Sequence, residues 1–250
     1  MKNKKVFITG ATSGLGKLIA ELCLKKGHEV YATGRNEEAL NHLSKLGARV
    51  LKGDLSNKED IHRICSKLPD IDVAIINAGV GFFQYAFNLS EKEIDAMIDI
   101  NVRAPMYFVK NLSPNMIKKR SGHFIFIGSQ AGKVATKKAS IYAATKHAIT
   151  GFANGVRMEL APYNVQVSAV YPGPIDTPFL DKASSSSASY RNSLKGVLLS
   201  PEKVAKEVIK LIDRPLREIN LPKILNITSK LYAVAPTIVE TLGKKFFTKK

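Results

Sequence analysis

The sequence of 250 residues has no tryptophan, two cysteines and five histidines. Cys23 and Cys65 both fall in helix-like segments, where a thiol is expected to be buried and reduced. We therefore predict no disulfide, and a protein of the reducing cytoplasm. His123 and His147 have no partners at the spacing of metal ligands, so both are interpreted as structural and we predict no metal site.

Long apolar runs are also missing. None reaches the roughly 18 to 20 consecutive residues that a membrane-spanning helix needs. The opening MKNKKVFIT is not expected to be a signal peptide, because its apolar stretch is short and runs into a glycine-rich turn.

Acidic residues are few: 21 Asp and Glu face 38 Lys and Arg, giving a formal net charge of +17 at pH 7. Such an excess favours polyanionic partners, which include phosphorylated cofactors, acidic membranes and nucleic acid. Solvated lysines are expected to explain most of it. Because no RNA-binding motif or helix-turn-helix signature accompanies the charge, we predict no nucleic-acid partner.

The sequence alternates short apolar runs with amphipathic helical stretches. Nearly continuous apolar runs are typical of parallel strands covered on both faces. The predicted strands are Val6–Thr9, Glu29–Thr33, Arg49–Lys52, Val73–Ile76, His123–Ile127, Val165–Tyr171 and Glu218–Leu221. The predicted helices are Leu15–Lys26, Glu37–Leu46, Lys58–Lys67, Arg103–Lys119, Ser140–Ala161 and Glu202–Asp213. This order predicts an α/β fold, a doubly wound parallel sheet of the Rossmann type. We expect one domain, with residues 1–222 as its catalytic and cofactor-binding part and residues 223–250 as a lysine-rich helical C-terminal extension.

A glycine-rich turn joins the first predicted strand to the first predicted helix. Glycines permit a tight turn and let backbone N–H groups approach a pyrophosphate, while the helix N-terminus adds positive potential. Because a strand precedes it and a helix follows, the turn predicts a dinucleotide site rather than a glycine turn without ligand. The residues expected to bind are Gly10, Thr12, Ser13, Gly14, Leu15 and Gly16.

The end of the second predicted strand bears on the choice of cofactor. It reads Tyr31-Ala32-Thr33-Gly34-Arg35, with no acidic residue to hold the adenosine ribose hydroxyls of NAD. A guanidinium can pair with a ribose 2′-phosphate and stack on adenine. Arg35 therefore predicts NADP(H); the alternative is a solvated loop charge.

Tyr142 and Lys146 lie four residues apart in a predicted helix and so share one face. The ordinary tyrosine pKa, near 10, suits proton transfer poorly at neutral pH, and a nearby cation lowers it. Ser129 follows an apolar run at the carboxyl end of a predicted strand, where sites of α/β proteins form. Taken alone, the tyrosine and lysine would be an exposed helix pair; with Ser129 they predict a catalytic group.

With these residues in place, the sequence resembles the short-chain dehydrogenase/reductase family, in its Tyr-x-x-x-Lys form. The resemblance covers nearly the whole chain. It rests on the turn Thr9–Gly16, Asp54-Leu55, Asn77-Ala78-Gly79, Asn101, Ser129, Tyr142 with Lys146, and Pro172-Gly173 followed by Thr177. It implies an NADP-dependent oxidoreductase that acts on a carbonyl or alcohol group, with Tyr142 as general acid in reduction and base in oxidation.

The resemblance also implies the remaining roles. Ser129 would hydrogen-bond the substrate oxygen, Lys146 would lower the tyrosine pKa and bind the nicotinamide ribose, and Asn101 would hold a water of a proton relay. The implied cofactor contacts are Asp54 and Leu55 at the adenine, Asn77, Ala78 and Gly79 on the far wall, Thr177 at the carboxamide, and Pro172, Gly173 and Ile175 beside it. Read alone, Asp54 would be a turn residue and Asn101 a hydrogen-bonding residue of a helix.

The chain lacks the Thr-Gly…Val-Asp-Gly-Gly strand of the family's acyl-carrier-protein reductases and reads Arg217-Glu218-Ile219-Asn220-Leu221-Pro222 instead. That ending is more similar to members acting on hydrophobic ketones, aldehydes or alcohols, of steroid or lipid type. The alternative function is a non-catalytic NADP(H)-binding regulator on the same fold, which would usually have a damaged Tyr/Lys/Ser set. By resemblance we also expect a homodimer or homotetramer, formed through Arg103–Lys119 and Ser140–Ala161.

Two segments break the alternation. Pro178–Leu199, with Ser184–Ser187, is predicted to be mobile or irregular. Within it, Phe179–Leu199 lies where the family carries a substrate lid; the alternative is a surface loop without a gating role. After Pro222, apolar residues recur at spacings of three and four, and lysines follow them. These are Ile224, Ile227, Leu231, Val234, Ile238 and Leu242, then Lys244, Lys245, Lys249 and Lys250 around Phe246-Phe247. The stripe is expected to dock on the chain's own core or a second subunit, or else weakly on an anionic membrane.

Overall fold

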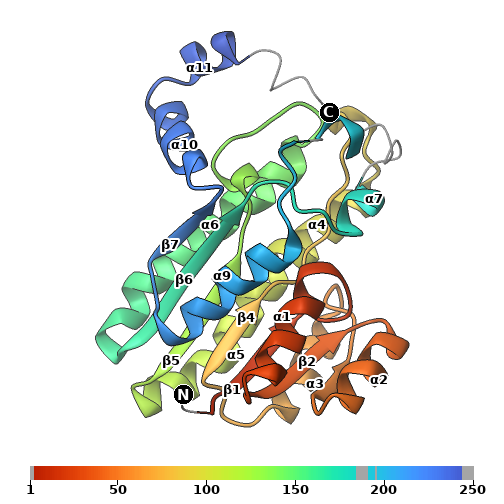
Figure 1. Cartoon of the computed structure of the whole chain (residues 1–250), viewed down its shortest axis with the longest axis vertical. Coiled ribbons are helices and arrows are strands. Elements are labelled where there is room, and N and C mark those ends of the chain that lie inside the picture. Colours follow the sequence, from red (N-terminus) through yellow and green to blue (C-terminus); the bar gives the residue numbers. More distant parts are fainter. Residues whose placement is uncertain (1–2, 184–190, 195, 244–250) are drawn as a thin grey trace.

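A computed structural model describes residues 3–183, 191–194 and 196–243. Its centre is one seven-stranded parallel sheet in the order β3-β2-β1-β4-β5-β6-β7 (Figure 1). The strands are β1 (Lys5–Thr9), β2 (Glu29–Gly34), β3 (Arg49–Lys52), β4 (Val73–Ile76), β5 (Gly122–Ile127), β6 (Val165–Pro172) and β7 (Glu218–Leu221). Every predicted strand is present, and the predicted doubly wound parallel sheet is confirmed.

Helices cover both faces of the sheet and bury its alternating side chains. In β1, Val6 and Ile8 point into one core and Phe7 into the other, and all three are fully buried. The first core is closed by α1 (Gly14–Lys25), α2 (Glu37–Lys45) and α9 (Pro201–Asp213). The second core is closed by α3 (Lys58–Lys67), α5 (Ala104–Lys119) and α6 (Ser140–Leu160).

The chain changes direction across the sheet between β1 and β4. From β1 it winds outward to β3, then crosses back so that β4 pairs with the other side of β1. At such a switch point the loops after the two strands separate and leave a crevice. The loops are tied together at their base, because the Thr9 hydroxyl accepts hydrogen bonds from the backbone N–H groups of Asn77 and Ala78 at 2.9 and 3.0 Å.

One helix was missed by the sequence pattern. α4 (Glu91–Ile98) continues through a π turn, Asp99–Arg103, directly into α5, whose first residue, Ala104, is one residue after the predicted start at Arg103. Ser90 caps α4 with a capping box, in which its hydroxyl accepts from the Glu93 N–H and the Glu93 carboxylate accepts from the Ser90 N–H. The Ser-x-x-Glu pattern was the local signal for this helix.

The segments that break the alternation are partly helical. Pro178–Leu199, predicted to be irregular, contains α7 (Phe179–Ala183), while Ser184–Ser187 lie outside the described residues. The tail forms α10 (Ile224–Val234) and α11 (Pro236–Leu242), which project beyond β7 (Figure 1). In the described part of the chain, no helix is both long and apolar enough to span a membrane.

The predicted stripe of the tail stays exposed on α10 and α11. Its members are Ile224, Ile227, Leu231, Val234, Ile238 and Leu242. The expectation that this stripe docks on the chain's own core is therefore wrong for the described residues. The physical reason is the orientation of α10, which turns the opposite side, with buried Ser229, toward the body. The lysines from Lys244 onward and Phe246-Phe247 lie outside the described residues.

Candidate active site

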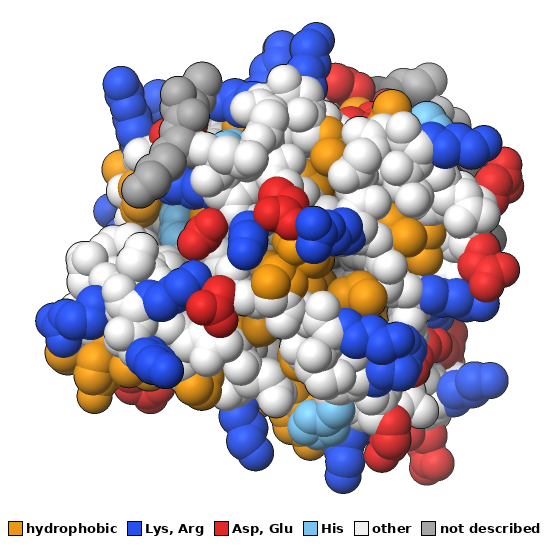
Figure 2. Space-filling model, turned by 90° about the horizontal axis from the view of Figure 1, so that it is seen from below, with side chains coloured by type: hydrophobic (Ala, Val, Ile, Leu, Met, Phe, Trp, Pro, Cys, Tyr) orange, Lys and Arg blue, Asp and Glu red, His pale blue; other side chains and the backbone are white. Residues whose placement is uncertain are grey.

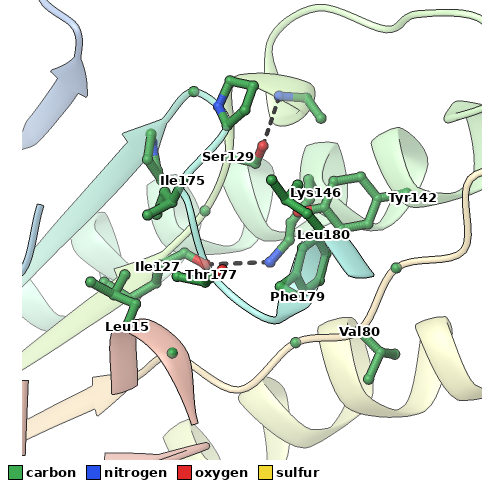
Figure 3. A pocket seen from close by; sticks show the side chains of 18 of the residues that line it. Leu15, Val80, Ile127, Ser129, Tyr142, Lys146, Ile175, Thr177, Phe179 and Leu180 are labelled. Atoms are coloured by element: carbon green, nitrogen blue, oxygen red, sulfur yellow. Dashed lines mark hydrogen bonds between the residues drawn. The ribbon is translucent and has the colours of Figure 1, made fainter. Parts of the chain in front are cut away.

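A cavity of about 950 Å³ follows the carboxyl edge of the sheet, from the turn after β1 to the start of α10. Its volume is at the upper end of what small-molecule and cofactor sites have. All of the predicted site residues line it except Asn101. Figure 3 shows one part of the cavity, where Ser129, Tyr142 and Lys146 lie close to Thr177 and Phe179.

The turn after β1 needs glycine for two different reasons. Gly10 and Gly14 have φ angles of +66° and +50°, in the left-handed region that side chains rarely adopt. At Gly16 the limit is space, since a Cβ would lie 2.2 Å from the Gly10 carbonyl oxygen and 2.4 Å from Asn77 Nδ2. The sequence thus lets α1 begin directly against the ends of β1 and β4.

The start of α1 offers free hydrogen-bond donors to the cavity. Within residues 3–183, Ser13 makes no side-chain hydrogen bond as N-cap, and no acidic residue stands in the first turn. The first N–H groups of a helix have no partner within it and carry partial positive charge. Together with the left-handed glycines, this start fits the pyrophosphate of a dinucleotide.

Arg35 and Asp54 meet at the rim of the cavity. The Arg35 Nη1 lies 3.6 Å from Asp54 Oδ2, and the two side chains are 64% and 40% exposed. Burial tends to raise the pKa of Asp54, but the hydrogen bonds from the Ser56 N–H and hydroxyl, with the Arg35 charge, outweigh it and lower that pKa. Asp54 is therefore ionised at neutral pH, and Arg35 already has an anionic partner before any phosphate binds.

Asn101 stands in the π turn and is buried behind the cavity wall. Its Oδ1 accepts from the Val80 N–H at 2.9 Å, and its Nδ2 donates to the Val80 carbonyl at 2.8 Å and to Thr145 Oγ1 at 3.0 Å. Thr145, which sequence reasoning missed, donates in turn to the Tyr142 carbonyl at 2.8 Å. Asn101 therefore holds the loop after β4 against the helix that carries Tyr142.

Tyr142 lies among aromatic rings. Its ring centroid is 5.4 Å from that of Phe83 and 5.8 Å from that of Phe179, and the residue is 8% exposed. Burial raises the pKa of Tyr142 to about 12, although a hydrogen bond with the Ser129 side chain lowers it in part. Ser129 Oγ also accepts from the Ala131 N–H at 3.1 Å, which orients the hydroxyl.

Lys146 is buried one helical turn further along α6. Its Nζ lies 5.7 Å from the Tyr142 ring centroid and donates to the Ile127 carbonyl at 3.4 Å. Burial lowers the pKa of Lys146 to about 8. For Tyr142, the loss of water around the phenol outweighs the effect of the Ser129 hydrogen bond. That Lys146 lowers the tyrosine pKa stays a prediction.

Apolar side chains from separate segments form the cavity wall beyond Tyr142. They include Phe83, Val134, Phe179, Leu180, Leu194 and Leu225. The Phe83 N–H donates to the Ala183 carbonyl at 2.6 Å, so the loop after β4 is joined to α7. Gly81 lies beneath both rings, since a Cβ there would be 2.8 Å from Phe179 Cζ and 3.2 Å from Tyr142 Cδ2. Phe179, Leu180 and Leu194 fall in the segment predicted to be a substrate lid or a surface loop. Phe83 was missed, and its local signal was the pair Phe82-Phe83 after the Asn77-Ala78-Gly79 motif.

This arrangement sets a phenol, a hydroxyl and an ammonium at one end of a cavity whose other end suits a pyrophosphate. Such a set can move a proton to or from an oxygen held beside a bound dinucleotide. Among residues 3–183, 191–194 and 196–243, His, Cys, Asp and Glu form no group of three or more that could hold a metal ion.

Comparison with known proteins agrees with this geometry. The family model described as short chain dehydrogenase matches residues 4–188. An uncharacterized oxidoreductase of Staphylococcus aureus (strain MW2) is 32% identical, covering 86% of this chain and 93% of the relative. The uncharacterized oxidoreductase YxnA of Bacillus subtilis (strain 168) is 30% identical and covers 98% of this chain and 72% of the relative.

Solved structures give the same fold. The closed form of a serine dehydrogenase complexed with NADP+ is 28% identical, with a TM-score of 0.81 over 87% of this chain and 94% of that one. A short-chain dehydrogenase from Sphingobium yanoikuyae in complex with NADPH is 23% identical, with a TM-score of 0.81 over 96% and 95%. A short chain dehydrogenase/reductase from Burkholderia phymatum in complex with NAD is 20% identical, with a TM-score of 0.84 over 95% of both chains.

Proposed function

Because this chain belongs to the short-chain dehydrogenase/reductase family, we propose that it is an NADP(H)-dependent oxidoreductase for the carbonyl or alcohol group of a hydrophobic substrate. The observation that carries the proposal is the meeting of Ser129, Tyr142 and Lys146 at the wall of the same cavity that the glycine turn enters. The bound nicotinamide would supply or accept the hydride. The chain's own residues would position the substrate oxygen and handle its proton.

Tyr142 is the acid in reduction and the base in oxidation. Its hydroxyl, hydrogen-bonded to Ser129, stands where a substrate oxygen can share both groups. Two donors aimed at that oxygen stabilise the negative charge that develops on it during reduction. Burial keeps the phenol protonated, which is the form that acts as the acid in reduction.

The preference for NADP(H) rests on Arg35. The exposed guanidinium at the rim can leave Asp54 and pair with a ribose 2′-phosphate. Thr33 and Gly34, at the end of β2, provide no carboxylate that would bind the ribose hydroxyls of NAD. Relatives of similar fold were solved with NADP+, NADPH or NAD, so the family alone does not choose the cofactor.

The wall beyond Tyr142 favours a hydrophobic substrate. Phe83, Phe179, Leu180 and Leu194 surround the space next to the phenol, and an apolar ligand there would bury surface that water now contacts. A second candidate is a small hydroxy acid, which the likeness to a serine dehydrogenase suggests. Lys182, the cationic side chain of α7 that lines the cavity, would be its carboxylate partner.

We place the enzyme in the cytoplasm and expect a homodimer or homotetramer built on α5 and α6. The placement rests on the low number of cysteines. Burial raises the pKa of Cys23 to about 12 and that of Cys65 to about 11. Both are then unreactive, and neither belongs to the cavity.

The test is a cofactor-oxidation screen on purified protein. NADPH consumption is followed across aldehydes, ketosteroids, quinones, sugars and β-ketoacyl thioesters, and NADP+ reduction with L-serine and other hydroxy acids. We expect turnover with an apolar carbonyl, and an affinity for NADPH at least tenfold (about 1.4 kcal/mol) above that for NADH. Tight NADPH binding with no turnover on any substrate would favour the non-catalytic regulator instead.

Substitution of the phenol assigns the acid. Tyr142→Phe should lower turnover by at least about 10², the usual contribution of a general acid, while NADPH still binds. Tyr163→Phe, which removes a 40% exposed phenol at the end of α6, is the matched control and should keep full activity. Near-normal carbonyl reduction by Tyr142→Phe would remove Tyr142 from the mechanism.

A further inference from the structure

The tail presents an apolar surface that the described chain leaves uncovered. The residues of the stripe on α10 and α11 are 59–86% exposed: Ile224 59%, Ile227 64%, Leu231 59%, Val234 86%, Ile238 61% and Leu242 84%. Single exposed apolar residues are ordinary, but six within 19 residues form a patch, and such patches mark binding surfaces.

The stripe lies on one face of α10 and points away from the body. Ile224, Ile227 and Leu231 are spaced by three and four residues, which places them on a common side of the helix. Ser229, on the other side, is 5% exposed, and Leu225 Cδ1 lies 3.4 Å from where a Cβ of Gly173 would stand. One face of α10 thus packs against the body, and the opposite face exposes the stripe to solvent.

The charged residues of the tail are almost all basic. Residues 223–250 contain six lysines and one acidic residue, Glu240, so this segment has a net charge of +5, out of +17 for the chain. Lys223 and Lys230 are exposed and flank the stripe on α10. An apolar face bordered by lysines is complementary to an anionic bilayer surface. The apolar side chains can insert among the acyl chains, and the anionic headgroups attract the lysines.

The opposite edge of the molecule differs. Seen from below, acidic and basic side chains are interspersed (Figure 2). At the amino end of β4, for example, Lys119 pairs with Asp70 and Asp72 at 3.5 and 3.8 Å. Acidic residues on this edge offset part of its positive charge, whereas the tail has six lysines and a single acidic residue, so the tail combines positive charge with an exposed apolar face.

The stripe begins at the mouth of the cavity. Ile224, Leu225 and Thr228 all line the cavity, and Ile224 is also the first exposed residue of the stripe. A surface seated on α10 would therefore lie against the opening through which the apolar wall near Tyr142 is reached. If the stripe on α10 bound a lipid bilayer, the bilayer would therefore lie next to the opening of the apolar cavity.

We propose that the apolar face of α10 and α11, with its flanking lysines, docks the protein on anionic bilayers and sets the mouth of its cavity against the lipid. The access of a lipid-dissolved substrate by this route rests on the proposed function. The docking itself does not, and it can be measured without turnover.

The test is co-sedimentation of the full chain with vesicles of phosphatidylcholine, alone or with about a third phosphatidylglycerol. Wild type should pellet with the anionic vesicles and lose most binding on phosphatidylcholine or at high salt. Replacing Ile227 and Leu231 together by serine should weaken binding at least about tenfold, because both side chains lose their apolar contact with lipid. Lys223→Gln with Lys230→Gln should weaken it on anionic vesicles alone.

The matched control removes two exposed apolar residues at the other edge, Leu46→Ser with Leu216→Ser, which are 49% and 56% exposed. This control should bind vesicles as wild type does. The proposal is overturned if wild type stays in the supernatant, or if the stripe variant binds undiminished. It is overturned equally if wild type ignores lipid and the stripe instead holds an oligomer together, seen in analytical ultracentrifugation as a lower sedimentation coefficient of the stripe variant. A failed enzyme screen would leave each of these results unchanged.

Discussion

At the scale of single residues, the site depends on two ionisable groups that have lost their water. Tyr142 and Lys146 are 8% and 5% exposed, and burial moves the pKa of each toward its neutral form, up to about 12 for the phenol and down to about 8 for the ammonium. At pH 7 the tyrosine keeps its proton and the lysine keeps most of its charge. The lysine is therefore held charged in a place that disfavours charge.

The free-energy cost of burying the charged Lys146 predicts how the stability of the folded protein changes with pH. The folded-state pKa of Lys146 is lowered from 10.5 to about 8, so the unfolded chain binds more protons between these values and stability rises with pH there. Lys146→Met should stabilise the ligand-free protein at pH 7, by up to about 3 kcal/mol, and its advantage should shrink above pH 8. Denaturant unfolding from pH 6.5 to 9.5 measures this.

Lys137→Met, which replaces an exposed lysine, is the control for that measurement and should show no such trend. If Lys146→Met were no more stable than wild type at pH 7, the ammonium would not be desolvated as described.

Residues within one local motif were the ones that the sequence predicted best. The glycine turn and the Tyr142/Lys146 pair depend on spacing along one segment, so their place in a common cavity could be predicted. Phe83 approaches Tyr142 from the loop after β4 and Phe179 from α7, both distant in the chain, and Thr145 acts through a hydrogen bond from Asn101. Contacts of this kind arise from the fold, and no local pattern encodes them.

At the scale of elements, the π turn between α4 and α5 has a structural task. It places Asn101 so that one amide serves both backbone groups of Val80 and reaches Thr145 on α6. π turns inside helices are frequent at functional sites. Here the turn connects three segments of the cavity wall.

Removal of that amide should therefore destabilise the fold. Asn101→Ala removes the partner of the N–H and of the carbonyl of half-buried Val80, and the loss of a typical hydrogen bond costs about 0.5–1.5 kcal/mol. We expect a lowered free energy of unfolding in denaturant titration. Asn115→Ala removes an exposed bond to Asp70 and should change it by less than about 0.5 kcal/mol. A stable but inactive Asn101→Ala would instead support the implied water relay.

Secondary-structure elements that are buried on both faces, such as the strands of the sheet, were predictable from the sequence. The strands carry continuous apolar runs, and all seven were found with their ends within one residue. α4 was missed because, of its residues, only Met97 is buried, so its apolar pattern is weak even though its capping box is complete. The tail was predicted as a helical stripe, but its exposure was not, because periodicity does not say what a face meets.

At the scale of the whole molecule, α6 carries a second uncovered face. Gly151, Gly155 and Met158 follow one another at spacings of four and three, and Met158 is 72% exposed. Among the described residues, nothing lies within 4 Å of a Cβ built at either glycine. Small residues on an open helix face allow another helix to approach closely, in agreement with the oligomer expected from the family.

We predict that the protein sediments as a dimer or tetramer and that Gly151→Arg shifts it toward the monomer. The long charged side chain would occupy the space that a partner helix needs. Ser44→Arg, on an exposed position of α2, is the control and should not change the sedimentation coefficient. Analytical ultracentrifugation over a range of concentrations decides, and a wild type that is monomeric throughout would contradict the prediction.

Gly81, on which the rings of Tyr142 and Phe179 rest, bears on which molecules the cavity can accept. Any other residue would have a Cβ atom at this place, and that atom would collide with the Phe179 ring. The glycine therefore allows Phe179 of α7 to pack against the Tyr142 ring. A larger side chain at position 81 should displace α7 away from Tyr142. The cavity would then enclose a bound molecule less tightly. We therefore expect the absence of a side chain at position 81 to limit the size of the molecules that this cavity accepts.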